Sequence, residues 1–140
     1  MISYPIKGYK FFVLLLFCTG FNFFSSCHSR SDYKQALLSD YVGGICEASF
    51  QLGEAKDTSA VKFLLTKILD GRASTHISYK GMSACYCRLV ALRKISGIVP
   101  PGGYPKEHDV DTMAVNFYLN WAVEKGYLKN RNEVNIYYSK

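Results

Sequence analysis

Residues 111–126 read DTMAVNFYLNWAVEKG and carry the clearest helix signal in this chain. Asp111, or Asp109 just before it, is a residue type that caps helix N-termini, and Gly126 is the type that ends helices. Between them an apolar row recurs at three- and four-residue steps, the spacing of one helix face. The row consists of Met113, Phe117, Trp121 and Ala122 or Val123. This stretch therefore predicts a capped amphipathic helix.

The same spacing predicts three earlier helices. The first begins at Tyr33, capped by Ser31 or Asp32, and ends at Gly53, with Gly43-Gly44 marking a kink or a close helix contact. The second is capped by Asp57 or Thr58 and stops at Asp70-Gly71, and the third opens at Gly81 or Met82 and ends at Gly97. Their apolar rows are Leu38, Tyr41, Val42, Ile45, Ser49 and Leu52; Val61, Leu64, Leu65, Ile68 and Leu69; and Cys85, Leu89, Leu92 and Ile95.

Turn residues separate these segments, and little in the chain suggests strands. Pro100-Pro101-Gly102-Gly103 is the strongest break, just before the last helix. Residues 133–140 predict either a short strand or a packed tail. With 49% hydrophobic and 20% charged residues, the composition is that of a folded domain. We expect an all-α fold of about four helices.

The N-terminus has the three parts of an export signal. Lys7 and Lys10 provide positive charge, residues 11–24 are largely apolar, and Ser25-Ser26 are small. The apolar part is interrupted by Gly20 and Asn22 and is shorter than a membrane-spanning helix requires. We therefore expect a signal peptide over residues 1–26, a lipidated tether over 27–32 and a helical domain over 33–140.

Phe24-Ser25-Ser26-Cys27 resembles a bacterial lipobox, in which small residues precede a cysteine that becomes lipidated. The resemblance implies that Cys27 is the lipidation site, although an aliphatic residue is usual where this chain has Phe24. Cys18 is the competing cysteine, but the bulky Phe17 precedes it. The expected location is the cell envelope, with the protein lipid-anchored to a bacterial membrane and its mature domain outside the cytoplasm.

Residues 59–97 resemble a HEAT-like helical repeat. Ser59-Ala60-Val61-Lys62-Phe63-Leu64-Leu65 is similar to the start of its first helix, and Ala91-Leu92-Arg93-Lys94-Ile95-Ser96-Gly97 to the end of its second. The resemblance implies stacked helix pairs and a tendency to bind partners. It carries no catalytic residues.

Three cysteines follow Cys27, namely Cys46, Cys85 and Cys87. An exported protein meets an oxidising compartment, so we expect either one disulfide or three buried thiols. Cys85 and Cys87 point about 200° apart on a helix and cannot readily pair with each other. Cys46 can therefore pair with either one, and Cys85 is slightly favoured because it shares the face of Leu89. His76 with these cysteines matches no zinc pattern, and we predict neither a metal nor another cofactor.

The distribution of charged residues argues against one class of partner, and one cluster of ionisable residues gives an enzyme hypothesis. The chain has a formal net charge of +6, and the basic residues are interspersed with acidic ones, which argues against nucleic-acid binding. Glu107, His108 and Asp109 cluster after the Pro-Gly break and could form a hydrolase-type acid–base site. Capping and the helix dipole explain acidic residues there without catalysis.

Tyrosine is abundant, with 11 residues, and exposed Tyr and Arg favour protein interfaces. We expect Arg72, Tyr79 and Tyr104, from two loops, to share a binding surface at one end of the fold. The predicted function is therefore a membrane-anchored, protein-binding envelope lipoprotein that is not an enzyme. An immunity or inhibitor lipoprotein that neutralises an envelope-targeted toxin is the alternative.

Overall fold

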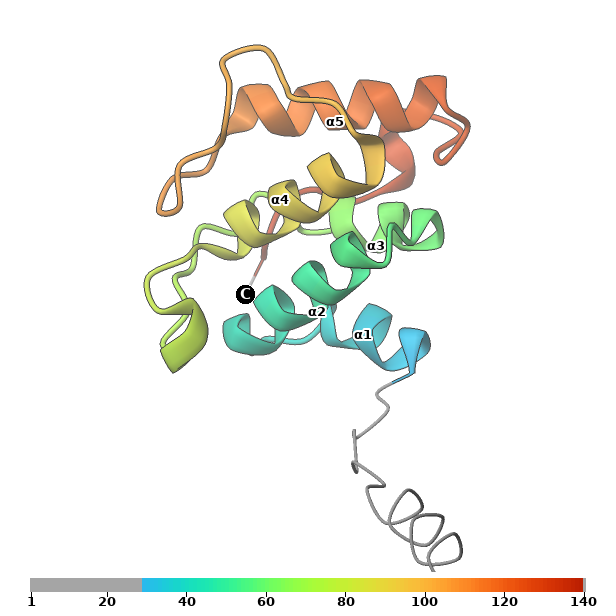
Figure 1. The fold of residues 1–140 in the computed structure, drawn as a ribbon. Helices are drawn as coiled ribbons and strands as arrows, with labels where there is room; N and C mark the ends of the chain where they lie inside the picture. The colour runs from blue at the N-terminus through green and yellow to red at the C-terminus, as the bar shows by residue number, and fades with distance from the viewer. Residues whose placement is uncertain (1–28, 140) are drawn as a thin grey trace, which may run out of the picture.

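The computed structural model describes residues 29–139 and shows a helical fold (Figure 1). The predicted leader, Cys27 and the start of the predicted tether up to His28 lie outside the described residues. In the described part, five α-helices and three single turns of 3₁₀ helix are present and no strand is formed, which confirms the all-α prediction. The helices are α1 (Arg30–Ala36), α2 (Val42–Glu54), α3 (Val61–Leu65), α4 (Ala84–Ser96) and α5 (Thr112–Glu124). The 3₁₀ turns are η1 (Thr58–Ala60), η2 (Ile77–Tyr79) and η3 (Arg131–Glu133).

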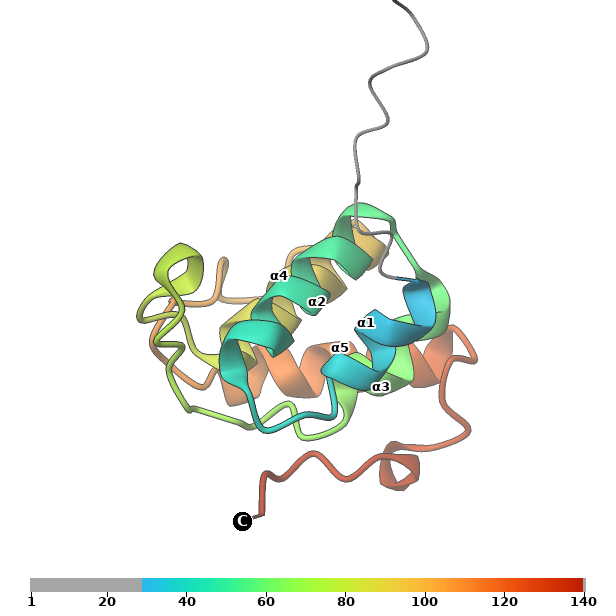
Figure 2. The same cartoon turned by 90° about the horizontal axis from the view of Figure 1, so that it is seen from below.

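Helix α4 lies at the centre of the fold. It packs along α2 on one side, contacts α3, and has α5 on its other side, while α1 packs against α2 (Figures 1 and 2). The long helices can approach closely because small residues meet at the α2–α4 crossing. A Cβ added to Gly53 would lie 2.9 Å from the Cα of Ala91, closer than real Cβ contacts occur. The close helix contact that we expected at Gly43-Gly44 is thus made at Gly53.

A disulfide joins the same two helices. It links Cys46 in α2 to Cys87 in α4, with the Cα atoms 5.0 Å apart. The preference for Cys85 as the partner of Cys46 was wrong: Cys85 is a free, buried thiol. The reason is that α4 is buried on more than one side, so Leu89 and Cys87 are both in the core although they do not share a face.

The helix expected from Tyr33 to Gly53 is two helices. Helix α1 begins at a capping box in which Ser29 and Asp32 bond each other's backbone N–H groups, and the chain turns before α2 starts. The glycines at 43 and 44 fall in the first turn of α2, where the Tyr41 ring covers them. A Cβ on Gly43 would lie 2.7 Å from that ring, so a larger residue would displace it.

Helix α3 is much shorter than expected. Asp57 caps the 3₁₀ turn η1 that leads into α3, and the buried row of Val61, Leu64, Leu65 and Ile68 agrees with the prediction. However, the helix ends at Leu65 because Thr66 is extended and Lys67 has a left-handed φ of 56°. Residues 59–97 therefore form one short and one long helix, and the two equal helices of a HEAT-like unit are not confirmed.

One buried arginine satisfies the backbone at the end of α3. Arg88 of α4 is 1% exposed, and its Nη1 donates to the carbonyls of Phe63, Leu64 and Thr66. Its Nη2 donates to the carbonyl of Leu37, after α1, at 2.6 Å. Helix ends leave backbone carbonyls without hydrogen-bond donors. Here a single guanidinium donates to carbonyls at two helix ends. Burial lowers the pKa of Arg88 to about 10, which still leaves it charged at neutral pH.

Helix α5 keeps its predicted bounds, and of its predicted row Trp121 and Ala122 are buried, whereas Phe117 is only half-buried. Asp111 is the N-cap, with its carboxylate accepting from the N–H of Ala114 at 2.9 Å. Met113, which we placed on the core face, is 62% exposed. The core face consists of Ala114, Val115, Tyr118, Leu119, Trp121 and Ala122.

The C-terminal segment is a packed tail, the second of the two expected outcomes. After η3 it runs beside the segment that follows α3. The N–H groups of Lys67 and Leu69 donate to the carbonyls of Asn135 and Ile136, at 2.7 and 2.9 Å. Val134 is buried in the core, and the Arg72 guanidinium lies 3.9 Å from the centre of the Tyr138 ring. Two backbone bonds and a ring contact hold this tail without forming a sheet.

Candidate binding surfaces

The outer side of α5 and the loop that precedes it expose apolar side chains. The loop from Gly97 to Asp111 runs back along α5 after leaving α4 (Figure 1). We call this region the outer α5 surface, and its members are Ile98, Val99, Tyr104, Val110, Met113 and Phe117. All but the half-buried Phe117 are exposed, Tyr104 by 68%. Contiguous apolar exposure of this kind is typical of interaction sites.

Two hollows follow this surface. The first, of about 390 Å³, is lined by Tyr104, Val110 and Met113 with neighbouring loop residues. The second, of about 350 Å³, is lined by Ile98, Phe117 and Trp121 among others. Met113 and Phe117 are one helical turn apart, so the two hollows lie along the same helix. The surface therefore offers room for more than one side chain of a partner.

Contacts with the helices fix the loop that forms this surface. The Tyr118 hydroxyl donates to the carbonyl of Ile98 at 2.8 Å, and burial raises the pKa of Tyr118 to about 12. The Arg93 guanidinium lies 4.4 Å from the centre of the Tyr104 ring, a cation–π distance. The exposed side chains therefore project from a positioned backbone.

A second exposed region is the loop between Ala73 and Ser83, which contains η2. His76 and Tyr79 stack with ring centres 5.4 Å apart, and Tyr79 also contacts Phe50 of α2 at 5.5 Å. A Cβ on Gly43 would lie 2.7 Å from the Tyr41 ring and 2.8 Å from His76 Cβ, so both side chains border this glycine. His76, Tyr79 and Phe50 thus form an aromatic row, and Ile77, which follows His76 in the chain, is 90% exposed.

The three residues of the predicted surface have separate neighbours. Arg72 makes a bidentate ion pair with the buried Asp70 and donates to the Asp40 carbonyl at 2.9 Å. Tyr79 belongs to the aromatic row, and Tyr104 to the outer α5 surface. The two loops do meet at one end of the fold, where His108 Nδ1 lies 2.7 Å from the Gly81 carbonyl (Figures 1 and 2). A surface shared by the three side chains stays a prediction.

Glu107, His108 and Asp109 are all exposed and serve mainly through the backbone. The Glu107 carbonyl accepts from the N–H of Ser83 at 2.8 Å, and the Asp109 carbonyl accepts from the Ser83 hydroxyl at 3.4 Å. Because a carbonyl can only accept, His108 Nδ1 must donate to Gly81. These contacts tie the loop before α5 to the loop and cap at the start of α4.

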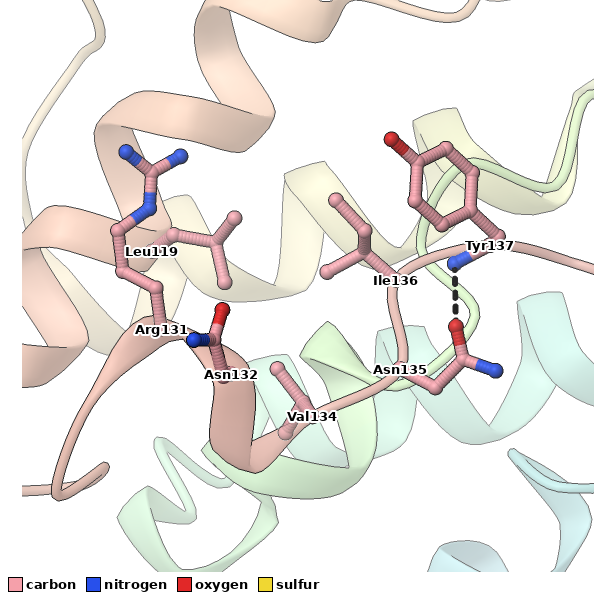
Figure 3. A pocket seen from close by; sticks show the side chains of 7 residues that line it. All are labelled: Leu119, Arg131, Asn132, Val134, Asn135, Ile136 and Tyr137. Carbon is pink, nitrogen blue, oxygen red and sulfur yellow. Dashed lines mark hydrogen bonds between the residues drawn. The ribbon is translucent and has the colours of Figure 1, made fainter.

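A groove of about 510 Å³ lies between α5 and the C-terminal tail (Figure 3). Figure 3 shows Leu119, Val134 and Ile136 around its apolar floor, with Arg131 at one end. Arg131 donates to the side-chain oxygen of Asn116. The groove is open, and its floor is the side of the core that the tail covers only in part.

Other kinds of site find less support in residues 29–139. There, no group of three or more His, Cys, Asp or Glu side chains is arranged to hold a metal ion. Burial raises the pKa of the Cys85 thiol to about 11, which disfavours the thiolate that a nucleophile needs. Within the same range, every helix is too short or too polar to cross a bilayer.

Sequence reasoning missed the exposed Ile77 and the buried Arg88. Ile77 follows no helical row, and the only available signal was an isoleucine in a polar loop.

No protein-family model matches the chain, and no curated protein or solved structure is significantly similar to it. Any function must therefore be inferred from the surfaces of the molecule itself.

Proposed function

We propose that this chain is a lipid-anchored protein of the bacterial cell envelope that binds another protein and does not act by catalysis. The observation that carries the proposal is the outer α5 surface. Met113 at the start of α5 and the loop residues Ile98, Val99, Tyr104 and Val110 are apolar side chains that the fold leaves exposed. Exposed apolar side chains that line neighbouring hollows are typical of interaction sites. A partner that packs on Met113 and Tyr104 would bury them.

The disulfide supports the proposed location. Cys46 and Cys87 pair across the two central helices, and disulfides persist mainly in oxidising compartments. The leader and the lipobox-like Phe24-Ser25-Ser26-Cys27 agree with export and anchoring. The resemblance of residues 59–97 to a HEAT-like repeat supports only the partner-binding part of the proposal. An immunity or inhibitor role is the version in which the partner is a toxin.

Two measurements test the proposal. Mass spectrometry of the protein from membranes should show a chain that begins at an acylated Cys27. An intact residue 1, or an unmodified sulfur at position 27, would contradict the anchoring.

Binding is tested by affinity isolation of the tagged protein from detergent-solubilised membranes, followed by identification of co-purified proteins. We expect one protein in stoichiometric amount with the wild type and at least about tenfold less with Met113→Ser or Tyr104→Ser. The matched control is Lys125→Ser, an exposed position after α5 that lines neither hollow. Equal recovery by all variants, or no stoichiometric protein, would contradict the binding function.

A further inference from the structure

The described fold begins two residues after the proposed anchor. Ser29 is the N-cap of α1, where its hydroxyl accepts from the N–H of Asp32 and its own N–H donates to the Asp32 carboxylate. Only His28 separates Ser29 from Cys27 in the sequence. Two residues of fully extended chain span at most about 7 Å. A lipid on Cys27 would therefore hold the start of α1 close to the bilayer surface.

Helix α1 is in turn fixed to the rest of the fold. Lys34 Nζ donates to the Ser59 hydroxyl at 2.6 Å and lies 3.6 Å from the carboxylate of the buried Asp57. Leu37, directly after α1, is buried, and its carbonyl accepts from Arg88 of α4. These contacts join α1 to η1 and α4, so a restraint on the start of α1 orients the whole domain.

The outer α5 surface lies far from the start of α1. Helix α1 packs on α2, α2 on α4 and α4 on α5, and Figure 1 shows these helices one above another. Axes of packed helices lie about 8–10 Å apart, so three such steps separate α1 from α5 by about 25 Å. Helix α5 also begins on the side opposite the start of α1 (Figures 1 and 2). Met113, its second residue, is therefore near the corner of the fold most distant from the anchor.

The charges near α1 are compatible with a bilayer. Lys34 and Asp57 form an ion pair there, as do Lys94 and Glu54 at the neighbouring end of α2. The ionisable side chains at this end are Arg30, Lys34, Lys56 and Lys94, and Asp32, Glu54 and Asp57. Four cations against three carboxylates leave this end without net negative charge, so anionic headgroups do not repel it.

The charges beside Met113 have the opposite balance. Among the residues that line the hollow next to it, Lys106 is the only cation, against the carboxylates of Asp109 and Asp111. Anionic headgroups attract basic segments, and this rim offers net negative charge instead. The apolar side chains of the outer α5 surface are therefore better covered by a protein than by lipid.

We propose that the short tether holds α1 against the bilayer and that the outer α5 surface faces away from the membrane. The protein partner, or the part of it that binds, then lies in the aqueous compartment and not within the membrane. This inference rests on the proposed lipid anchoring and partner binding, and it adds the side from which the partner approaches.

Photo-crosslinking in vesicles tests the orientation without the partner. The full chain is matured in cells with a photoreactive amino acid at the exposed position 31 in α1 or at 113, and the acylation of Cys27 is verified by mass spectrometry. Each protein is placed in vesicles of phosphatidylethanolamine and phosphatidylglycerol and irradiated. We expect lipid adducts from position 31 and none from position 113.

The other outcomes separate this inference from the proposed function. Lipid adducts from position 113, or none from position 31 of an acylated chain, would overturn the orientation and leave the anchoring standing. A chain without acyl groups on Cys27 would overturn the anchoring and the orientation together.

A longer tether tests whether the short one causes the orientation. An insertion of about 20 Gly and Ser residues between His28 and Ser29 adds a root-mean-square span of about 25 Å, similar to the distance across the fold. The lipid adducts from position 31 should fall, while the thermal midpoint stays that of the wild type. Unchanged lipid adducts would overturn the role of the tether.

The side of approach is tested in the cells that produce the chain. A photoreactive amino acid at position 113 should capture the protein partner through a segment in the aqueous compartment, as mapped by mass spectrometry of the adduct. An adduct within a membrane-spanning segment would overturn the inference and leave protein binding standing. The absence of any protein adduct would overturn the binding function, and the vesicle assay would still decide the orientation.

Discussion

Helices α4 and α5 have 13 residues each and pack against one another, yet each departs from simple amphipathicity in its own way. Helix α4 buries a charged residue, Arg88, together with a disulfide-bonded cysteine. Helix α5 does the reverse, because Met113 is exposed while the opposite face fills the core. One helix has a polar group inside, and the other has apolar groups outside.

The fold itself explains the first departure but not the second. Arg88 is buried because the carbonyls after α1 and at the end of α3 need donors. Met113 stays 62% exposed and, with Tyr104, lines a hollow on the surface. Buried polar groups need hydrogen-bond partners inside the fold, whereas exposed apolar groups are removed from water when a partner covers them. The difference points to α4 as the structural helix and α5 as the binding helix.

The largest expected effect is on the disulfide of α4. Reduction of Cys46–Cys87, which spans 41 residues, should lower the free energy of unfolding by about 4 kcal/mol, because the link restricts the unfolded chain. Urea unfolding with and without reductant measures it. Cys85→Ala is the matched control, and its reductant-dependent loss should equal that of the wild type. Equal midpoints with and without reductant would show that the link contributes nothing.

Arg88→Met tests whether the buried guanidinium is needed. Four backbone carbonyls lose a donor, each at a cost of about 1–3 kcal/mol, and part of this is offset because methionine is buried more easily. The expected net loss is about 3 kcal/mol in urea unfolding. Arg88→Lys should recover only part of it, since an ammonium cannot reach both helix ends. A loss below about 1 kcal/mol would contradict the role given to Arg88.

The free thiol of α4 gives a pH-dependent prediction. Burial raises the pKa of Cys85 to about 11 from 9.0. Below pH 9 the thiol is neutral in both states, and between pH 9 and 11 only the unfolded chain loses the proton. Stability should therefore fall with rising pH, by about 2 kcal/mol between pH 9 and pH 11 and by about 2.7 kcal/mol in the limit, at about 1.36 kcal/mol for each pKa unit.

Comparison with Cys85→Ala isolates this effect, because tyrosines and lysines titrate equally in both proteins. The difference in unfolding free energy between wild type and variant should change by about 2 kcal/mol from pH 9 to pH 11. A pH-independent difference would mean that the thiol is accessible to water in the folded state.

Local sequence signals predicted much of the fold. Asp57 and Asp111 cap their helices, Gly97 ends α4, and the row from Val61 to Ile68 is buried. These features depend on neighbouring residues, so the sequence pattern contains them. The length of α3 could not be predicted in this way, because the chain leaves the helix at Thr66 and Lys67 where it meets the tail.

The departures in α4 and α5 could not be read from one-face periodicity. Helix α4 is enclosed by α2 and α5, so a buried face does not tell which cysteine meets Cys46. Helix α5 has two apolar rows, and the sequence alone cannot tell which one the core takes. The binding surfaces depend on that choice. Of the predicted trio, Tyr104 and Tyr79 lie on the two candidate surfaces, whereas Arg72 is held in an ion pair with Asp70.

The smallest expected effect concerns the start of α5. Asp111→Ala removes the carboxylate that accepts from Ala114 and should cost about 1 kcal/mol of stability, within the range of about 0.5–2 for helix caps. Asp109→Ala, two residues earlier, should cost almost nothing. The Ser83 hydroxyl donates to the backbone carbonyl of residue 109, which alanine keeps. Thermal unfolding of both variants measures the difference.

The same pair of variants, with Glu107→Ala and His108→Ala, separates capping from catalysis. If the cluster were an acid–base site, Asp109→Ala, Glu107→Ala or His108→Ala would abolish a hydrolytic activity while the fold survived. The structure instead leads us to expect that the loss of stability follows Asp111 and that binding by the outer α5 surface survives Asp109→Ala. Binding should weaken in Asp111→Ala only as far as the first turn of α5, which carries Met113, loosens with its cap.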